Sequence, residues 1–204
     1  MQTKKGFTLL ELLIVIGILS ILSTTVVLVI NPAQLLKKAR DSQRIADLNA
    51  VKTAIAYYIT ETGSPSIGGT TDTYSDGDGA VVCTLGGGSR PANANQGVLT
   101  ASTAGWIPIA FNTMTGGSPI ASLPQDPAVD VSTENHYYVY GVSSATDYTF
   151  KLIANMESAY YSGDSGTGDV ESTDGGTIDT LYEVGTDMTL TVTTTANCFN
   201  DPGV

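Results

Sequence analysis

Basic residues are scarce in this chain: 9 Lys and Arg stand against 20 Asp and Glu in 204 residues, which gives a formal net charge of -11. Proteins that bind nucleic acid through its phosphates need clustered Lys and Arg. The balance therefore argues against a general nucleic-acid binder. The basic residues are also unevenly placed, because only Arg90 and Lys151 follow residue 52. The chain divides into a basic, apolar N-terminal part and an acidic remainder.

Histidine and cysteine, which often perform catalysis and bind zinc, are nearly missing. There is one histidine, His136, and the two cysteines have no CxxC spacing. Two cysteines are too few for a zinc site. The chain also has no GxGxxG motif, no P-loop lysine motif and no HExxH motif. The sequence predicts neither an enzyme nor a cofactor, and it predicts a structural role for His136.

A long apolar segment is present near the N-terminus. Residues 7–30 (FTLLELLIVIGILSILSTTVVLVI) contain one charge, Glu11. A helix of that length spans roughly 36 Å at 1.5 Å per residue, which is enough to cross a bilayer. Lys4 and Lys5 precede the segment, so the N-terminus is expected in the cytoplasm and the acidic body outside.

Two simpler interpretations of this segment are a cleaved signal peptide and an uncleaved signal anchor. The apolar run is longer than the 7 to 15 residues of a signal peptide, and no small-residue cleavage region follows it. Neither interpretation explains Glu11, because a carboxylate inside a membrane span costs about 2.5 to 3.5 kcal/mol on insertion scales. A helix that later packs against copies of itself could use the carboxylate to meet a positive partner.

The stretch KKGFTLLELLIVIGILSIL resembles the class III signal of type IV pilins and their pseudopilin relatives. It has a short basic leader, then Gly6, then Phe7, with Glu11 four residues later. The resemblance implies cleavage by a prepilin peptidase between Gly6 and Phe7, and N-methylation of the new Phe7 amine. It further implies that Glu11 of one subunit meets the Phe7 amine of a neighbour in a filament.

By the same resemblance, the function expected is that of a structural subunit of a type IV pilus, a homopolymer that serves adhesion, motility or DNA uptake. The subunit would be held in the inner membrane and then be moved to a surface filament by an assembly platform and motor. The alternatives are a major pseudopilin of a type II secretion system and a signal-anchored extracellular binding domain. SLPQDP, at residues 122–127, is similar to the strand region of major pseudopilins and of many Gram-positive-type pilins. The tryptophan-glycine pair that pseudopilins commonly place after that Asp-Pro is absent, which favours the pilus.

A second helix is expected at 31–62. Asn31 can cap it, with Pro32 at its first position, and Gly63 and Pro65 end it. Apolar residues at helical spacing predict one face packed on a sheet: Ile45, Leu48, Val51, Ile55 and Ile59. The basic residues are expected to stay exposed, as a solvated face, as partners for acidic bodies of neighbouring subunits, or as contacts to phospholipid headgroups: Lys37, Lys38, Arg40, Arg44 and Lys52.

The rest of the chain predicts an α+β fold in which the long N-terminal helix packs on a C-terminal antiparallel sheet, as in type IV pilins. Residues 1–6 would be the leader, 7–30 the membrane and filament-core helix, 31–62 the amphipathic helix, and 63–105 a connecting loop rich in Gly, Ser, Thr and Asp. Residues 106–204 would hold the sheet and a C-terminal loop region. Strands are expected at 106–111, 136–142, 148–155 and 188–195.

Two features of the expected loops have open interpretations. The acidic stretch at Asp72, Asp76 and Asp78 could supply oxygen ligands to calcium, although it lacks EF-hand spacing, so a solvated loop is the other interpretation. Cys83 and Cys198 are expected to form a disulfide outside the cell, since pilins often pin a C-terminal segment this way, and two free buried thiols are the alternative.

Overall fold

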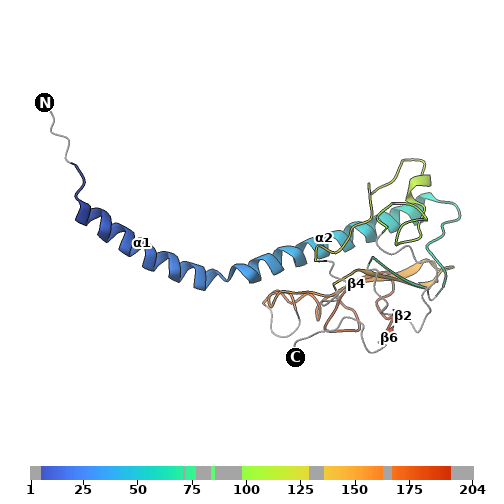
Figure 1. Cartoon of the computed structure of the whole chain (residues 1–204). Coiled ribbons are helices and arrows are strands. Elements are labelled where there is room, and N and C mark those ends of the chain that lie inside the picture. The colour runs from blue at the N-terminus through green and yellow to red at the C-terminus, as the bar shows by residue number, and fades with distance from the viewer. Residues whose placement is uncertain are drawn as a thin grey trace.

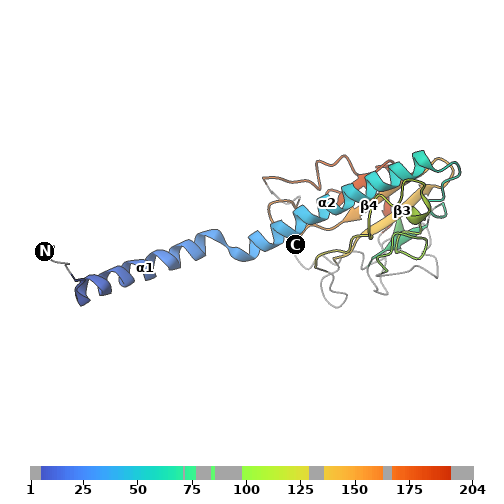
Figure 2. The same ribbon diagram turned by 90° about the horizontal axis from the view of Figure 1, so that it is seen from above.

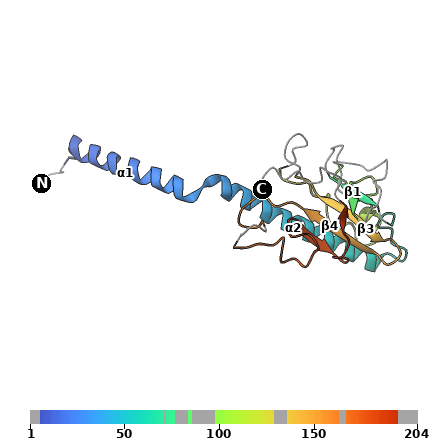
Figure 3. The ribbon, with the colours of Figure 1, turned by 90° about the horizontal axis from the view of Figure 1, so that it is seen from below.

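The computed structural model describes residues 6–70, 72–76, 84–85, 98–128, 136–162 and 167–193. Two consecutive helices, α1 (Leu9–Ile30) and α2 (Pro32–Glu61), form a long curved rod, and the β-structure gathers along the far end of α2 (Figure 1). Seen from above and from below, α1 extends away from the body without touching it (Figures 2 and 3). The molecule is therefore a stem joined to a body through α2.

The break between the helices lies at one residue, Asn31. It has a left-handed backbone conformation (φ 44°, ψ 77°) and closes α1 while capping α2. Its side chain accepts a hydrogen bond from the Gln34 N–H (3.4 Å). Pro32 occupies the first turn of α2, where its missing N–H would have had no helical partner. The expected restart of the helix at Asn31 and Pro32 is confirmed.

A four-stranded antiparallel sheet forms the centre of the body, in the order β1-β3-β4-β5. Its strands are β1 (Thr73–Ser75), β3 (Val139–Ser144), β4 (Thr149–Ala154) and β5 (Tyr182–Gly185). A separate antiparallel pair joins β2 (Thr84–Leu85) to β6 (Val192–Thr193), and a 3-10 turn, η1, covers Phe111–Thr113. The predicted fold class, a long helix on an antiparallel sheet, is confirmed.

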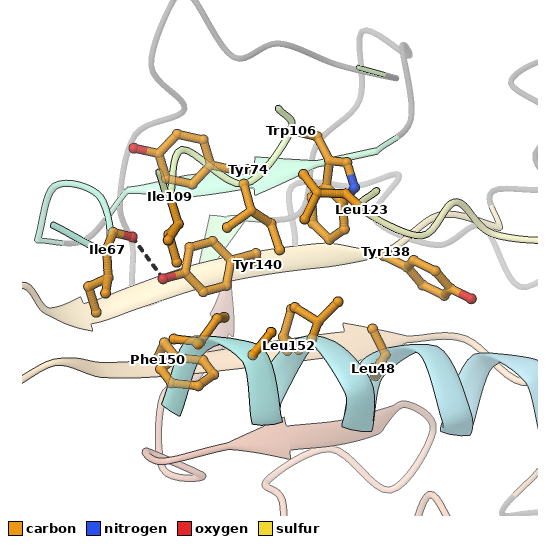
Figure 4. Close-up of a cluster of buried hydrophobic side chains, with 14 of the residues drawn as sticks. Leu48, Ile67, Tyr74, Trp106, Ile109, Leu123, Tyr138, Tyr140, Phe150 and Leu152 are labelled. Atoms are coloured by element: carbon orange, nitrogen blue, oxygen red, sulfur yellow. Dashed lines mark hydrogen bonds between the residues drawn. The ribbon is translucent and has the colours of Figure 1, made fainter. Parts of the chain in front are cut away.

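The core forms where α2 crosses the sheet next to β4 and β5. Leu48, Val51 and Ile55 are fully buried, and they meet the sheet face that carries Tyr140 and Leu152. Figure 4 shows Leu48 of the helix beside Leu152, with Trp106 and Leu123 beyond the sheet strand that carries Tyr140. Strand alternation sends Tyr137, Val139 and Ile153 to a smaller cluster on the other face. The apolar spacing of α2 thus predicted the buried side correctly, with Ile45 and Ile59 at its partly buried margin.

The strand expected at 106–111 is wrong. The segment packs as irregular chain that leads into η1, and Trp106, Ile107, Ile109 and Phe111 are all fully buried. The Trp106 indole N–H donates to the Pro124 carbonyl oxygen (3.0 Å), which fixes the side chain in the core. The residues of this segment are apolar because they are buried, and a buried segment need not be a strand.

β5 was not foreseen, because it is short and carries Glu183 and Gly185 in a turn-rich acidic stretch. Gly185 is required by its neighbour strand, since a Cβ there would lie 2.2 Å from the Phe150 carbonyl oxygen. Strands β1 and β2 also fall within the range expected to be a connecting loop.

Replacing Leu48 by alanine should lower the free energy of unfolding of the body by about 2–5 kcal/mol, because a fully buried leucine leaves a cavity. The measurement is denaturant unfolding of the full-length chain in detergent micelles, followed by the fluorescence of Trp106. Leu35→Ala is the matched control, because Leu35 is 54% exposed on the same helix, and its effect should stay within about 0.5 kcal/mol. Equal losses for both variants would contradict the proposed core.

Candidate functional site

The first site lies where α1 begins. Thr8 caps the helix, and its backbone N–H and its hydroxyl both donate to Oε2 of Glu11 (3.0 Å each). The Glu11 N–H donates back to the Thr8 hydroxyl (3.2 Å). This reciprocal arrangement is a capping box, which satisfies N–H groups that a helix start leaves without helical partners. Glu11 is therefore held by its own chain through one of its two carboxylate oxygens.

Gly6 and Phe7 precede that cap in non-helical chain, and Phe7 is 84% exposed. The peptide bond between them thus lies next to the capping box but outside the helix. The structure brings three of the predicted site residues, Gly6, Phe7 and Glu11, into one short segment.

The surface of α1 is apolar and uncovered. Every residue from Leu9 to Val26 is exposed, and this segment is the one helix in the described part of the chain that is long and apolar enough to cross a membrane. Its hydroxyl groups bond to the helix's own carbonyl oxygens, as in Ser20 to Gly17 (2.8 Å) and Ser23 to Leu19 (2.7 Å). Such side chains can enter an apolar environment without leaving an unpaired polar group.

A buried charge cluster fixes α2 to the body. Arg44 is fully buried, and its guanidinium donates to both oxygens of Asp126 (2.7 and 2.8 Å), to Asp41 (2.6 Å) and to Glu157 (2.5 Å). Arg40 binds the same Glu157 carboxylate. Burial alone would lower the pKa of Arg44, but the carboxylates of Asp126 and Glu157 outweigh it and raise the pKa. The arginine stays charged and joins three separate segments of the chain.

The segment after β4 is held along the beginning of α2. Asp41 accepts the backbone N–H groups of Glu157 (3.0 Å) and Ser158 (2.8 Å). Gln34 accepts the N–H of Ala159 (3.3 Å), one to two turns closer to the stem. The ammonium of Lys38 lies 3.3 Å from the ring centre of Tyr160, a cation–π contact. These contacts define where α2 leaves the body.

Two more carboxylates meet the same region. Asp76 accepts the N–H groups of Asp126 (2.8 Å) and Tyr138 (2.6 Å), and burial raises the pKa of Asp76 to about 7 despite those bonds. Asp47 accepts the Tyr138 hydroxyl (2.9 Å). The loop that carries Asp126 is thereby tied to β1 and β3 as well as to α2.

The expected exposure of the basic residues is wrong for Arg44, which is buried, and Arg40 and the three lysines are each partly buried. Two of the five pair with carboxylates of their own subunit rather than with water. Asp41 lies three residues before Arg44, and that spacing places both side chains on one helix face. This spacing is the one feature of the sequence that indicates an ion pair for Arg44. Asp126 and Glu157 could not have been identified, since they are distant in sequence.

Two of the three calcium candidates, Asp72 and Asp76, accept hydrogen bonds within the fold. Asp72 accepts the Gly69 N–H (3.1 Å) and the Tyr74 hydroxyl (3.0 Å) in the turn before β1, whereas Asp76 is buried after it. Asp78 lies outside the described residues, as do Cys83 and Cys198. Within the ranges that the structure describes, no group of three or more His, Cys, Asp or Glu side chains could hold a metal ion.

His136 is partly buried just before β3, and its charge would help to lower the pKa of Glu157. It thus belongs to the surroundings of the charge cluster, in keeping with a structural role.

Comparison with known proteins adds two findings. Residues 1–27 match the family model described as the prokaryotic N-terminal methylation motif. The chain is 37% identical over 111 residues to the type IV wide pilus major component PilA4 of Thermus thermophilus, and the match covers 54% of this chain and 75% of that protein. No solved structure matches the chain.

Replacing Arg44 by methionine should destabilise the body by about 3–5 kcal/mol, because Asp41 and Asp126 would be left buried without their cation and Glu157 would keep only Arg40. Unfolding of the full-length chain in micelles measures this loss. Lys37→Met removes a charge from the same helix outside the cluster and should cost far less. A loss below about 1 kcal/mol for Arg44→Met would contradict the role assigned to the cluster.

The stability of the body should also fall in acid. Burial acts to raise the pKa of Glu157, but Arg40 and Arg44 outweigh it and lower the pKa from 4.5 to about 2. At Glu157 the folded state therefore binds fewer protons than the unfolded state between these values, so the stability that Glu157 contributes is present above pH 4.5 and is lost as pH falls toward 2. The raised pKa of Asp76 acts in the opposite direction between pH 7 and pH 3.8.

Unfolding free energies measured between pH 2 and pH 6 check this prediction. Glu157→Gln should start from a lower stability at pH 6 and show a shallower loss in acid. An equally steep loss in that variant would assign the acid sensitivity to other groups.

Proposed function

The chain belongs to the type IV pilin family and is a structural subunit of a type IV pilus, and we propose that its exposed helix α1 serves first as membrane anchor and then as polymerisation element. The observation that carries the proposal is the apolar surface of α1, which is uncovered from Leu9 to Val26 and begins with a carboxylate at Glu11. The family relationship supports processing and polymerisation in general. The residues assigned below are proposals for this chain.

Processing would occur between Gly6 and Phe7. That bond lies in exposed, non-helical chain immediately before the capped helix, which is where a peptidase could reach an extended backbone. Lys4 and Lys5 would keep this end in the cytoplasm, so the prepilin peptidase would act on that side of the membrane. Cleavage would leave Phe7 as the new N-terminus, with an amino group that N-methylation keeps basic.

Glu11 would then direct assembly. Both bonds from Thr8 end on Oε2, so Oε1 can accept an N–H from the Phe7 amino group of a neighbouring subunit without dissolving the capping box. A carboxylate with a charged partner is tolerated in an apolar core, whereas a carboxylate without one is strongly unfavourable there. The pair would therefore favour one register between neighbouring stems.

The transfer from membrane to filament would exchange lipid contacts of α1 for contacts with other α1 helices. Its Ser and Thr side chains have their hydroxyls bonded to the helix backbone, so neither environment leaves them unpaired. An assembly platform and an extension motor would drive the exchange, starting in the inner membrane and ending in an extracellular filament. The role is structural and needs no cofactor, and it would support adhesion, motility or DNA uptake at the level of the whole pilus.

Two substitutions of Glu11 separate its charge from its capping role. Glu11→Gln removes the charge but keeps a side-chain oxygen for the capping box, and Glu11→Ala removes both. If the charge directs assembly, each variant should insert into the membrane normally and reduce sheared filament yield about tenfold or more, the effect of roughly 1.4 kcal/mol. The measurement is the amount of subunit in sheared fibres relative to the membrane pool.

Thr8→Ala is the matched control, since it removes the two hydroxyl bonds of the capping box, keeps the backbone bond to Glu11 and leaves the charge in place. It should assemble better than Glu11→Gln. Normal filament yield from Glu11→Gln would contradict the pairing proposed for Glu11, even though the family membership would stand.

A further inference from the structure

The stem joins the body over the first two turns of α2, and four consecutive residues there surround the helix. Leu35, Leu36, Lys37 and Lys38 follow each other at about 100° per residue. The two leucines therefore lie on one half of the circumference and the two lysines on the other half. Leu35 is 54% exposed and Leu36 is 63% exposed. This part of α2 is thus apolar on one side and basic on the other.

Two tyrosines of the body lie beside these residues. The Lys38 ammonium is 3.3 Å from the ring centre of Tyr160 and 5.9 Å from that of Tyr161, and the two rings meet edge to face. The bond from the Ala159 N–H to Gln34 holds this segment at the start of α2. Tyr160 still remains 38% exposed. The junction surface, as we call it from here on, consists of Leu35, Leu36, Lys37, Lys38 and Tyr160.

The two lysines of the junction surface differ from the arginines that follow them. Arg40 and Arg44 pair with carboxylates of their own subunit. In the part of the chain that the structure describes, neither Lys37 nor Lys38 pairs with a carboxylate. The cation–π contact orients Lys38 and leaves its charge in place. The lysines can therefore bind an anion from outside the subunit, whereas the arginines already have their partners.

The length of α1 places the junction surface at the edge of a membrane. A hydrocarbon core of about 30 Å takes about 20 residues of helix, so a span that starts at Leu9 leaves the core shortly before Ile30. The headgroup layer adds roughly 5–7 Å on each side, and the backbone of Lys37 lies about 10 Å of helix beyond Ile30. Side chains of a helix tilt toward its N-terminus, which is the membrane side here. The lysine side chains thus extend back toward the headgroups.

We propose that the junction surface binds anionic phospholipid headgroups of the membrane that holds α1, with Lys37 and Lys38 contacting the lipid phosphates. The inference rests on the proposed function, because it takes α1 as a membrane anchor. It goes further by assigning lipid binding to two of the five basic residues of α2 and by naming the class of lipid.

Each part of the junction surface suits one layer of that boundary. Leu35 and Leu36 would enter the margin of the hydrocarbon, directly after the apolar surface of α1. The lysines would extend their charged ends to the phosphates, as lysines near the ends of membrane helices do. Tyr160 would lie among the headgroups, where tyrosine is enriched.

A carboxylate of a neighbouring subunit is the other anion that the lysines could meet. It would leave the exposed leucines without an apolar contact, whereas a lipid supplies both a phosphate and acyl chains. The body is rich in acidic residues, so an anionic membrane attracts the subunit at the junction surface and repels it elsewhere. Lipid binding at this place would therefore hold the body above the membrane beside its stem.

The test captures the molecule that contacts the junction surface. The full-length chain, with a benzophenone amino acid in place of Leu36, is reconstituted at high dilution into vesicles of phosphatidylcholine and phosphatidylglycerol in equal parts. After irradiation, mass spectrometry identifies what is attached at position 36. Phospholipid should be attached, and phosphatidylglycerol should exceed phosphatidylcholine. Attachment to a second copy of the chain, or to no lipid, would overturn the proposal.

Substitution of the lysines tests their role in this preference. Lys37→Gln combined with Lys38→Gln should lower the ratio of phosphatidylglycerol to phosphatidylcholine at position 36 by about fivefold or more, the factor roughly expected for one lysine at an anionic surface. An unchanged ratio would overturn the role of the lysines. Because capture at position 36 is local, the basic residues before α1, at the opposite end of the membrane span, do not contribute to it.

Lys52 supplies the matched control. It is a partly buried lysine on the same helix, about 21 Å further from the membrane than Lys38. Lys52→Gln should leave the lipid ratio at position 36 unchanged, and a benzophenone at position 52 should capture no lipid. Equal losses of preference in Lys52→Gln and in the double variant would show a general effect of charge and would contradict a localised site.

The two proposals fail separately. If the full-length chain does not insert into the vesicles, the anchor role proposed for α1 is wrong. If it inserts and position 36 captures both lipids equally, only the headgroup binding is wrong.

Discussion

From Leu9 to Val26, the apolar surface of α1 has no partner among the described residues of its own subunit, and this single constraint shapes the rest of the molecule. Burying apolar area is the main favourable contribution to association, and α1 offers its whole circumference from Leu9 to Val26. Such a surface is unfavourable in water, so another molecule must cover it. In the proposed function, lipid covers α1 before assembly and copies of α1 cover it afterwards, so the same side chains would serve an anchor and a polymer.

A stem that changes its surroundings needs a body that keeps its structure through the change. The break at Asn31 separates the two parts, and the Arg44 cluster lies on the body side of that break. By binding Asp126 and Glu157 at once, Arg44 ties two loops to the helix that continues into the stem. The ion pairs are internal to the subunit, so assembly does not have to break them. Charge segregation along the chain, which could have reflected contacts between subunits, thus contributes first to the fold of one subunit.

The sequence predicts correctly those parts of the structure that depend on neighbouring residues alone. Apolar spacing predicted the buried side of α2, and Asn31 with Pro32 predicted where the helix restarts, because both depend on residues within one or two turns. The stretch around Trp106 was misread because its apolar residues fill a buried layer without joining a ladder. Over six residues, a buried irregular segment and a paired strand have similar patterns of apolar residues. Only a neighbouring strand that pairs with the segment distinguishes the two.

The candidate site also has a part that the sequence predicts and a part that it does not. The roles of Gly6, Phe7 and Glu11 are predicted from a short motif and stay predictions, and the structure adds that Thr8 already holds the Glu11 carboxylate. The buried state of Arg44 could not be predicted, because its partners Asp126 and Glu157 lie 82 and 113 residues further along the chain. Contacts at that separation depend on how β3 and β4 place their loops, which no short segment specifies.

In the proposed function, a membrane-held precursor becomes a filament subunit through its own N-terminal helix. The most direct test is the intact mass and N-terminal peptide of the chain recovered from sheared cell-surface fibres. Processing and assembly would give a chain that starts at N-methylated Phe7. A chain that still begins at Met1 in the membrane fraction, with none in the fibres, would contradict it and leave an ordinary membrane anchor.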